Sequence, residues 1–270
     1  MADSPKRKGA PRISEIPPGI LAQLNRGEIA TANLVEWLAI DQTQLLQIVL
    51  PQIGLQAALP ATLATIARQP ARSTAKLIPV IGTALLPVIK AQPKRQTSFA
   101  KLARHPSDVV RSWACHVVGS DDTLTLPQKL AAIRPFAADA HFGVREIAWM
   151  AVREYLDREL SAAIRLLSAW ATDADENIRR FASEATRPRG VWCRHIEMLK
   201  KNPERGYPIL EPLRSDAAKY VRDSVGNWLN DASKTQPAWV QNVCEHWSET
   251  SLTAETAYIV NKALRTIRKG

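Results

Sequence analysis

Hydrophobic residues recur along most of the chain at spacings of three and four, the period of an amphipathic helix. Between residues 160 and 170, for example, Ile164, Leu167 and Trp170 share one face of a predicted helix. The same pattern predicts helices at about 18–26, 32–50, 56–68, 71–90 and 253–268, with Pro51, Pro60, Pro79 and Pro87 marking starts, kinks or ends. Glycine is sparse, at 11 of 270 residues, so we predict an all-α fold.

A pair made of a β-branched residue and an arginine recurs through the second half of the chain. The four pairs are Val110-Arg111, Val144-Arg145, Ile178-Arg179 and Val221-Arg222, and their arginines lie 34, 34 and 43 residues apart. Each pair follows a short segment that contains aspartate, as expected for a helix start capped by an acidic or hydroxyl side chain. Two antiparallel helices repeating at this length are typical of a HEAT-like repeat solenoid, an α-α superhelix with a concave face.

The repeat also predicts how the chain is organised. We expect a single HEAT-like repeat domain at residues 15–270, with degenerate repeats in its first part, after a disordered basic tail at residues 1–14. The repeat arginines Arg111, Arg145 and Arg179 are expected to pair with acidic loops of their own or an adjacent repeat. The longer third step predicts an extra loop around residues 187–189.

Charge is distributed unevenly along the sequence. The formal net charge is +10, and no Asp or Glu occurs between Gln42 and Ser107. That segment carries eight cationic residues, Arg68, Arg72, Lys76, Lys90, Lys94, Arg95, Lys101 and Arg104. Such a surface suits a polyanion, because lysines and arginines that neutralise phosphates release condensed counterions. We therefore expect the concave face to be basic and to bind nucleic acid, with RNA binding or simple solvation as alternatives.

Several classes of protein are disfavoured by the sequence. The three cysteines lie far apart and form no C-x-x-C pair, and the five histidines lack metal-ligand spacing, so neither disulfides, a metal nor another cofactor is expected. The N-terminus lacks the apolar core of a signal peptide, and the apolar stretch 77–89 is short for a bilayer span. We expect a soluble, cytoplasmic, monomeric protein with no membrane contact.

Three carboxylates are predicted to meet on the inner face of the repeat. Positions one, five, and eight or nine after each repeat arginine share a helix stripe, which places Glu146, Glu184 and Asp231 on adjacent helices. Arg180 and Arg187 belong to the same stripe. Carboxylates inside a basic surface repel phosphates and so weaken DNA binding. Catalysis at a cationic centre would explain why they are present there. The alternative is that each is paired with a neighbouring arginine or solvated.

Two segments resemble those of a known family. Residues 183–192, Ser-Glu-Ala-Thr-Arg-Pro-Arg-Gly-Val-Trp, and residues 220–231, Tyr-Val-Arg-Asp-Ser-Val-Gly-Asn-Trp-Leu-Asn-Asp, resemble paired motifs of the AlkC-type alkylpurine DNA glycosylases. The resemblance is strong from about residue 142 to 247 and general before it. The chain departs from the family pattern at Gly190-Val191, Asp223, Gly226 and Trp228.

The resemblance implies an activity and a set of site residues. It makes Glu184 and Asp231 active-site carboxylates, Glu146 a third, and Trp192 an aromatic wall near the lesion. Asn227 and Arg187, with Arg180 beside them, would orient groups or contact DNA. The implied enzyme is a monofunctional glycosylase that removes cationic N-alkylated purines, chiefly 3-methyladenine, from duplex DNA.

The expected chemistry needs no general acid, because an alkylated purine already carries positive charge. Asp231 is expected to orient or deprotonate water, while Glu184 and Glu146 stabilise the oxocarbenium-like sugar. No lysine is placed for a Schiff base, so β-lyase activity is not expected. The alternative is a non-catalytic HEAT-like module that binds DNA or a protein partner through the same face.

Overall fold

The chain folds into helices throughout the part that the structure describes. The computed structural model describes residues 7–71, 73–190 and 192–269, and within these ranges no β-strand occurs. The prediction of an all-α protein is confirmed. Contacts divide the chain into unit 1, residues 1–123 with 140–151, and unit 2, residues 124–139 with 152–270. The prediction of one domain over 15–270 stays a prediction.

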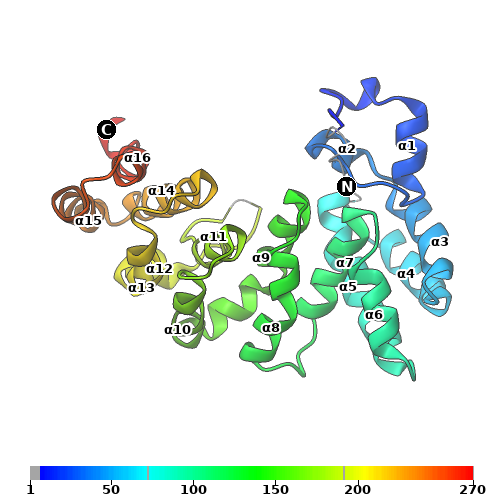
Figure 1. Cartoon of the computed structure of the whole chain (residues 1–270). Coiled ribbons are helices and arrows are strands. Elements are labelled where there is room, and N and C mark those ends of the chain that lie inside the picture. Colours follow the sequence, from blue (N-terminus) through cyan, green and yellow to red (C-terminus); the bar gives the residue numbers. More distant parts are fainter. Residues whose placement is uncertain (1–6, 72, 191, 270) are drawn as a thin grey trace. The chain divides into compact units, whose positions relative to one another are not determined.

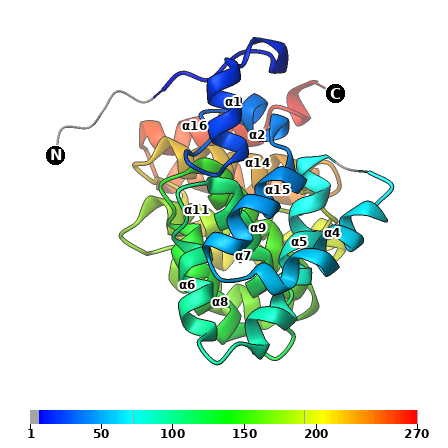
Figure 2. The same ribbon diagram turned by 90° about the vertical axis from the view of Figure 1, so that its right-hand side faces the viewer.

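Unit 1 begins with a single 3-10 turn and continues as a series of α-helices (Figure 1). Its elements are η1 (Ile13–Glu15), α1 (Pro18–Asn25), α2 (Leu34–Ala39), α3 (Gln42–Gln52), η2 (Gln56–Ala58), α4 (Leu59–Ala67), α5 (Thr74–Ala91), α6 (Arg95–Ala103), α7 (Asp108–Gly119) and the first part of α9 (Phe142–Arg158). Helix α7 packs against both α5 and α6, and Figure 2 shows the three near one another.

The predicted helix at 32–50 is wrong in one respect, since the segment forms two helices. Helix α2 ends at Ala39 and α3 begins at Gln42. Between them Asp41 is extended, and its carboxylate accepts hydrogen bonds from the backbone N–H groups of Thr43 (2.9 Å) and Gln44 (3.1 Å). An aspartate favours this helix-capping role over a place inside a helix.

Helix α5 contains the apolar stretch 77–89 and extends beyond it at both ends. It spans 18 residues despite Pro79 and Pro87, and by length and composition alone it could cross a membrane, so the expectation that it is too short is wrong. Its residues Leu77, Ile81 and Leu85 are nevertheless buried, and the helix packs against α7. This packing is that of a core helix in a folded domain.

The N-terminal segment is ordered earlier than predicted. Residues 1–6 of the expected disordered tail lie outside the described residues. In the described part, the guanidinium of Arg7 forms a bidentate ion pair with the buried carboxylate of Glu36. The amide of Asn33 donates to the backbone oxygen of Ala10 (2.8 Å). These contacts tie residues 7–14 to α2, so the boundary expected at residue 14 is too late.

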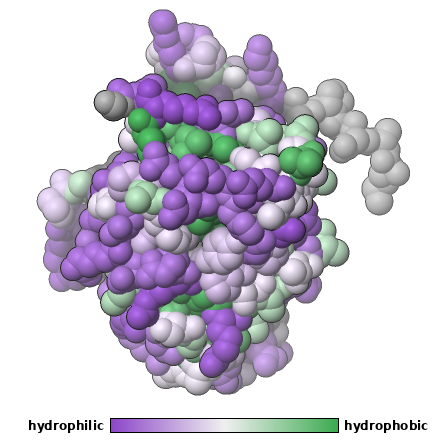
Figure 3. All heavy atoms as spheres, turned by 90° about the vertical axis from the view of Figure 1, so that its left-hand side faces the viewer, coloured by the Kyte–Doolittle hydropathy of each residue, from purple (hydrophilic) through white to green (hydrophobic). Residues whose placement is uncertain are grey.

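Unit 2 contains the repeat helices of the C-terminal half. Its elements are α8 (Leu126–Ala137), the rest of α9, α10 (Leu160–Trp170), α11 (Glu176–Ala185), α12 (Glu197–Lys201), η3 (Pro203–Gly206), α13 (Tyr207–Leu210), η4 (Glu211–Leu213), α14 (Lys219–Ser233), α15 (Pro237–Thr250), α16 (Ala254–Ala263) and η5 (Ile267–Lys269). Helix α14 packs between α11 and α16, which stacks one helix of each successive pair. On the face drawn in Figure 3, hydrophilic residues predominate and hydrophobic ones form small patches.

The helices that follow the repeat arginines begin where the sequence predicted. Helices α7, α9, α11 and α14 start at residues 108, 142, 176 and 219, so their starts keep the steps of 34, 34 and 43 residues. The extra length before α14 contains the predicted loop at 187–189 together with α12, α13 and two 3-10 turns.

The repeat arginines have a structural role, as predicted. The partners that all four share are backbone carbonyl groups. Each donates through Nη1 to carbonyl oxygens five or six residues earlier, for example Arg179 to Asp173 and Ala174 (both 2.9 Å). Arg111 and Arg222 make the same two bonds, and Arg145 donates to the backbone oxygen of Ala140, five residues earlier. Arg179 also forms the expected acidic pair, a bidentate one with Asp216 of the next repeat (2.6 and 2.9 Å). The arginine thus closes the loop that precedes its own helix.

Candidate functional site

Two of the three predicted carboxylates meet in unit 2, joined by one arginine. Arg187, just after α11, donates through Nη1 to Oε1 of Glu184 (2.8 Å). Through Nε and Nη2 it donates to Oδ2 of Asp231 on α14 (2.9 and 2.7 Å). Glu184 is 5% exposed and Asp231 is 4% exposed. We call Glu184, Arg187 and Asp231 the carboxylate cluster.

The surroundings of Glu184 keep its carboxylate ionised. Burial alone would raise its pKa, but nearby Arg180 and Arg187 and hydrogen bonds from Ser224 and Arg187 outweigh burial and lower the pKa of Glu184. The Ser224 hydroxyl donates to Oε2 (2.7 Å), and Arg180 Nη2 lies 3.5 Å from the same oxygen. The Arg180 guanidinium also stacks over the Tyr220 ring, 4.2 Å from its centroid. The predicted DNA-binding residue Arg180 is therefore part of the cluster's electrostatic support.

Asp231 differs from Glu184 in having one oxygen with little protein contact. Its Oδ2 carries both bonds from Arg187, whereas Oδ1 receives Lys234 Nζ at 3.3 Å. The Lys234 side chain is 42% exposed, so water competes for this contact. Oδ1 is thus the cluster atom best placed to accept a hydrogen bond from a water molecule.

The loop after α11 is held by a buried arginine, Arg153 on α9. Its guanidinium donates to three backbone oxygens, those of Ala185 (2.8 Å), Arg187 (2.6 Å) and Arg194 (3.0 Å). A side chain at Gly190 would bring its Cβ within 2.0 Å of Cys193 Sγ and 3.3 Å of Arg153 Nε, so this loop requires glycine there. Arg153 thereby fixes the backbone that presents Arg187 to the two carboxylates.

Replacing Arg153 by methionine is expected to lower the free energy of unfolding by at least about 2 kcal/mol, because three carbonyl groups lose a charged donor in a buried place. Urea denaturation measures this. Arg158→Met is the matched control on the same helix, since Arg158 is 60% exposed and pairs only loosely with Glu154. We expect a change within about 0.5 kcal/mol there. Equal effects of the two substitutions would contradict the role of Arg153.

Trp192 lies in the same loop and is 66% exposed. Its backbone φ of +65° is in the left-handed region, which is unfavourable for a large side chain and persists where the surrounding structure imposes it. A core role for this tryptophan is therefore excluded. Its predicted role beside a lesion stays a prediction.

Asn227 shares a face of α14 with Ser224, which bonds to Glu184, and with Asp231 of the cluster, since it lies three residues after the first and four before the second. Its side chain is half-buried. Among the described residues it has no hydrogen-bonding partner, so its amide is available to a ligand. Its predicted contact with DNA stays a prediction.

Glu146, the third predicted carboxylate, belongs to unit 1. Its Oε2 accepts a hydrogen bond from the indole N–H of Trp149 one turn along α9 (2.8 Å). Trp149 is 3% exposed, so the carboxylate satisfies a buried donor. The convergence of Glu146 with the carboxylate cluster stays a prediction, because the cluster lies in unit 2.

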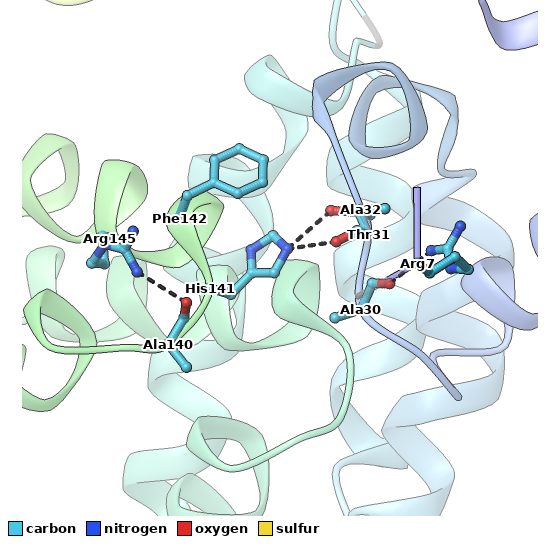
Figure 4. A pocket seen from close by; sticks show the side chains of 8 residues that line it. All are labelled: Arg7, Ala30, Thr31, Ala32, Ala140, His141, Phe142 and Arg145. Carbon is cyan, nitrogen blue, oxygen red and sulfur yellow. Dashed lines mark hydrogen bonds between the residues drawn. The ribbon is translucent and has the colours of Figure 1, made fainter. Parts of the chain in front are cut away.

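A pocket of about 390 Å³ lies at the start of α9 in unit 1 (Figure 4). His141, just before α9, points toward the segment before α2, where its Nε2 donates to the backbone oxygen of Thr31 (2.7 Å). Thr31 in turn donates to the buried carboxylate of Asp108 from its N–H (2.9 Å) and its hydroxyl (2.8 Å). The Phe142 ring stacks on His141 with centroids 4.7 Å apart. These bonds tie α7, α9 and the segment before α2 together.

The departures from the family pattern are matched by neighbouring residues. A side chain at Gly226 would bring its Cβ within 2.8 Å of Lys262 Cβ, so glycine allows α16 to approach α14 closely. Asp223 accepts bonds from Lys219 (2.7 Å), Lys262 (2.6 Å) and Tyr258 (2.7 Å), which lower its pKa against the effect of burial. Trp228 is fully buried. These positions therefore serve the packing of α14.

Two residues of the site were not singled out from the sequence. Ser224 lies within the quoted motif, at a spacing of seven from Asp231, which places both on one helix face. Arg153 bonds to three backbone oxygens here, and such bonds leave no pattern of residue types. A polar residue on the buried face of α9, between Trp149 and Leu156, was the available signal.

Part of the chain matches a known family of proteins. Residues 143–257 match the family of DNA alkylation repair enzymes. A Bacillus subtilis (strain 168) relative, the uncharacterized protein YhaZ, is 42% identical over 119 residues, which cover 44% of this chain and 33% of the relative. The chain therefore spans about a third of that relative's length.

Solved structures share the fold. The alkylpurine DNA glycosylase AlkC of Pseudomonas fluorescens, bound to DNA containing an abasic site analog, has a TM-score of 0.69 and 25% identity over 97% of this chain and 66% of its own. AlkD2 of Streptococcus mutans has a TM-score of 0.58 and 20% identity over 78% of this chain and 97% of its own. The predicted HEAT-like repeat fold is confirmed by these likenesses. Residues 143–257, which match the family model of the DNA alkylation repair enzymes, contain the carboxylate cluster, and the fold is shared with AlkC.

Proposed function

We propose that the protein is a DNA glycosylase that hydrolyses the N-glycosidic bond of cationic N-alkylated purines, such as 3-methyladenine, in duplex DNA. The observation that carries the proposal is the carboxylate cluster, two buried carboxylates on adjacent repeat helices inside the segment that matches the repair family. The likeness to AlkC, an alkylpurine DNA glycosylase bound to DNA, supports the same class of substrate.

The chemistry follows from the charge of the substrate. A purine alkylated at nitrogen is already positive, so it leaves with the electrons of the C1′–N9 bond without receiving a proton. The sugar then becomes positively charged, and ionised Glu184 and Asp231 are suited to stabilise that charge. A water molecule bonded to Oδ1 of Asp231 attacks C1′ and gives its proton to that carboxylate, which releases the proton to solvent.

The arginines do not remove this capacity. Glu184 is buried, where a carboxylate without partners would take up a proton and lose its charge. Arg180 and Arg187 lower the pKa of Glu184 and so keep it negative at neutral pH. The positive charge of the two arginines partly cancels the negative field of the carboxylates. Oδ1 of Asp231, which has little protein contact, limits this loss.

A second function is favoured by one specific observation. Both carboxylates already bond to Arg187 and have little exposed surface, as in a purely structural ion network. A non-catalytic repeat module that binds DNA would need no more than this. The two functions differ in whether a base is released.

The test is incubation of wild-type protein with methylated duplex DNA, followed by chromatography of the released bases. We expect time-dependent release of 3-methyladenine, and release of the neutral base hypoxanthine from a matched duplex at least about a hundredfold slower, because the site stabilises charge that a cationic leaving group has already prepared. Tight DNA binding with no base released would favour the non-catalytic module.

A cytoplasmic location and a monomeric state remain part of the proposal.

A further inference from the structure

A second feature of unit 1 lies outside the carboxylate cluster. It is the exposed face of α6, formed by Lys94, Thr97, Lys101 and Arg104, which follow one another at spacings of three, four and three. The opposite face buries Ser98 and Leu102. Residues spaced in this way lie in one row along a helix, so the three cations extend over roughly 15 Å.

The cations of this row are not neutralised by acidic side chains. Among the described residues none of Lys94, Lys101 and Arg104 forms an ion pair, and the sequence from Gln42 to Ser107 contains no Asp or Glu. By contrast Lys90, at the end of α5, pairs with Asp121 of the loop after α7 (2.5 Å). The row therefore carries an uncompensated positive charge.

Helix stability does not explain the whole row. Cations near a helix C-terminus are favourable, which accounts for Lys101 and Arg104. Lys94 and Arg95 lie at the N-terminus of α6, where a positive charge is unfavourable and where no acidic residue occurs in the first turn. Their presence calls for a partner outside the helix.

A shallow groove of about 410 Å³ borders the row. It is lined by Thr97, Lys101 and Arg104 together with apolar Ile53, Ala100 and Pro106. His105 completes the lining, and burial, with the nearby charge of Arg111, lowers its pKa to about 4. The groove thus offers cations for phosphates and apolar surface for sugars.

We propose that this face of α6 and its groove bind the sugar–phosphate backbone of duplex DNA, as a contact separate from the carboxylate cluster. A DNA strand carries one phosphate per 3.4 Å of axis, so about four phosphates pass along the row. The contact adds affinity and takes no part in bond breaking. The choice of DNA rests on the proposed function, and an acidic protein segment is the competing partner.

The test uses the full-length chain with Lys101→Gln and Arg104→Gln together, and undamaged duplex DNA as the probe. Loss of two phosphate contacts should reduce the slope of log K against log salt by about 1.8, and affinity near 0.1 M salt by roughly tenfold or more. The control is Arg12→Gln with Arg26→Gln, which removes the same charge from exposed sites of unit 1 where each arginine pairs with a glutamate, Glu15 and Glu28 respectively. There we expect a slope change below about 0.5.

Several outcomes would overturn the proposal. They are an unchanged slope in the α6 variant, an equal change in the control, or displacement of DNA by poly-glutamate as effectively as by competitor duplex. Thermal melting verifies that both variants are folded. The excision rate at saturating protein reports separately on the carboxylate cluster and should be the same in the α6 variant as in wild type. A wild type that releases no base, together with the expected slope change in the α6 variant, would refute the glycosylase proposal and leave the α6 contact standing.

Discussion

Asp231→Asn is expected to slow the release of 3-methyladenine from duplex DNA by about a hundredfold or more, the usual cost of removing one preorganised electrostatic group. Asparagine keeps the size of the side chain and can still accept a bond from Arg187. It loses the negative charge proposed to stabilise the sugar and the base proposed to take the proton from water. Single-turnover kinetics with protein in excess isolates the chemical step from binding and product release.

The matched control is Asp223→Asn on the same helix. Asp223 bonds to Lys219, Lys262 and Tyr258 rather than to the cluster, so its loss should affect stability and leave the excision rate within about threefold of wild type. A wild-type rate in Asp231→Asn, or equal slowing of excision by both substitutions, would contradict the catalytic role of Asp231.

Arg187→Met is expected to have the largest effect on stability, a loss of about 3–5 kcal/mol at neutral pH, because it leaves two buried carboxylates without their shared partner. Chemical denaturation measures the change. Lys234→Met is the control, because Lys234 approaches the same aspartate from a half-exposed position and should cost about 1 kcal/mol or less.

The effect of Arg187→Met should also depend on pH. In the wild type the pKa of Glu184 is lowered from its ordinary 4.5, so the ionised carboxylate favours folding above that value. This contribution is lost as the pH falls through the lowered pKa of the folded state. In the variant the pKa of Glu184 is lowered less, because the charge and hydrogen bond of Arg187 are absent. The stability gap between the two proteins should therefore stay nearly constant above about pH 4.5 and shrink as the pH falls below that value. A gap that stays constant there would show that the pKa of Glu184 does not depend on Arg187.

The fold could be predicted from the sequence wherever a residue pattern reflects local geometry. Helices α7, α9, α11 and α14 begin at the spacing of the repeat arginines, because those arginines bond to the loop just before each helix. The break at Asp41 was missed, because the apolar period continues across it while the side chain caps α3.

The sequence identified the residues of the site, but not the hydrogen bonds that join them. Helical spacing placed Glu184, Arg187 and Asp231 on facing stripes, and the structure joins them. That one arginine would bond to both carboxylates depends on the path of the loop after α11, which long-range bonds from Arg153 to backbone oxygens determine. Asp223 also lies on the helix stripe that carries Asp231, but it does not join the cluster. It bonds instead to α16, which approaches α14 closely at Gly226.

The most direct test is a double-mutant cycle with Glu184→Gln and Asp231→Asn, read as the single-turnover rate of 3-methyladenine release. If both carboxylates act on the same developing charge, each substitution slows the reaction strongly, and the pair together is only about as slow as the slower single variant. Wild-type rates in both single variants, or a double variant slowed by the full product of the two effects, would contradict a shared catalytic role for the two carboxylates.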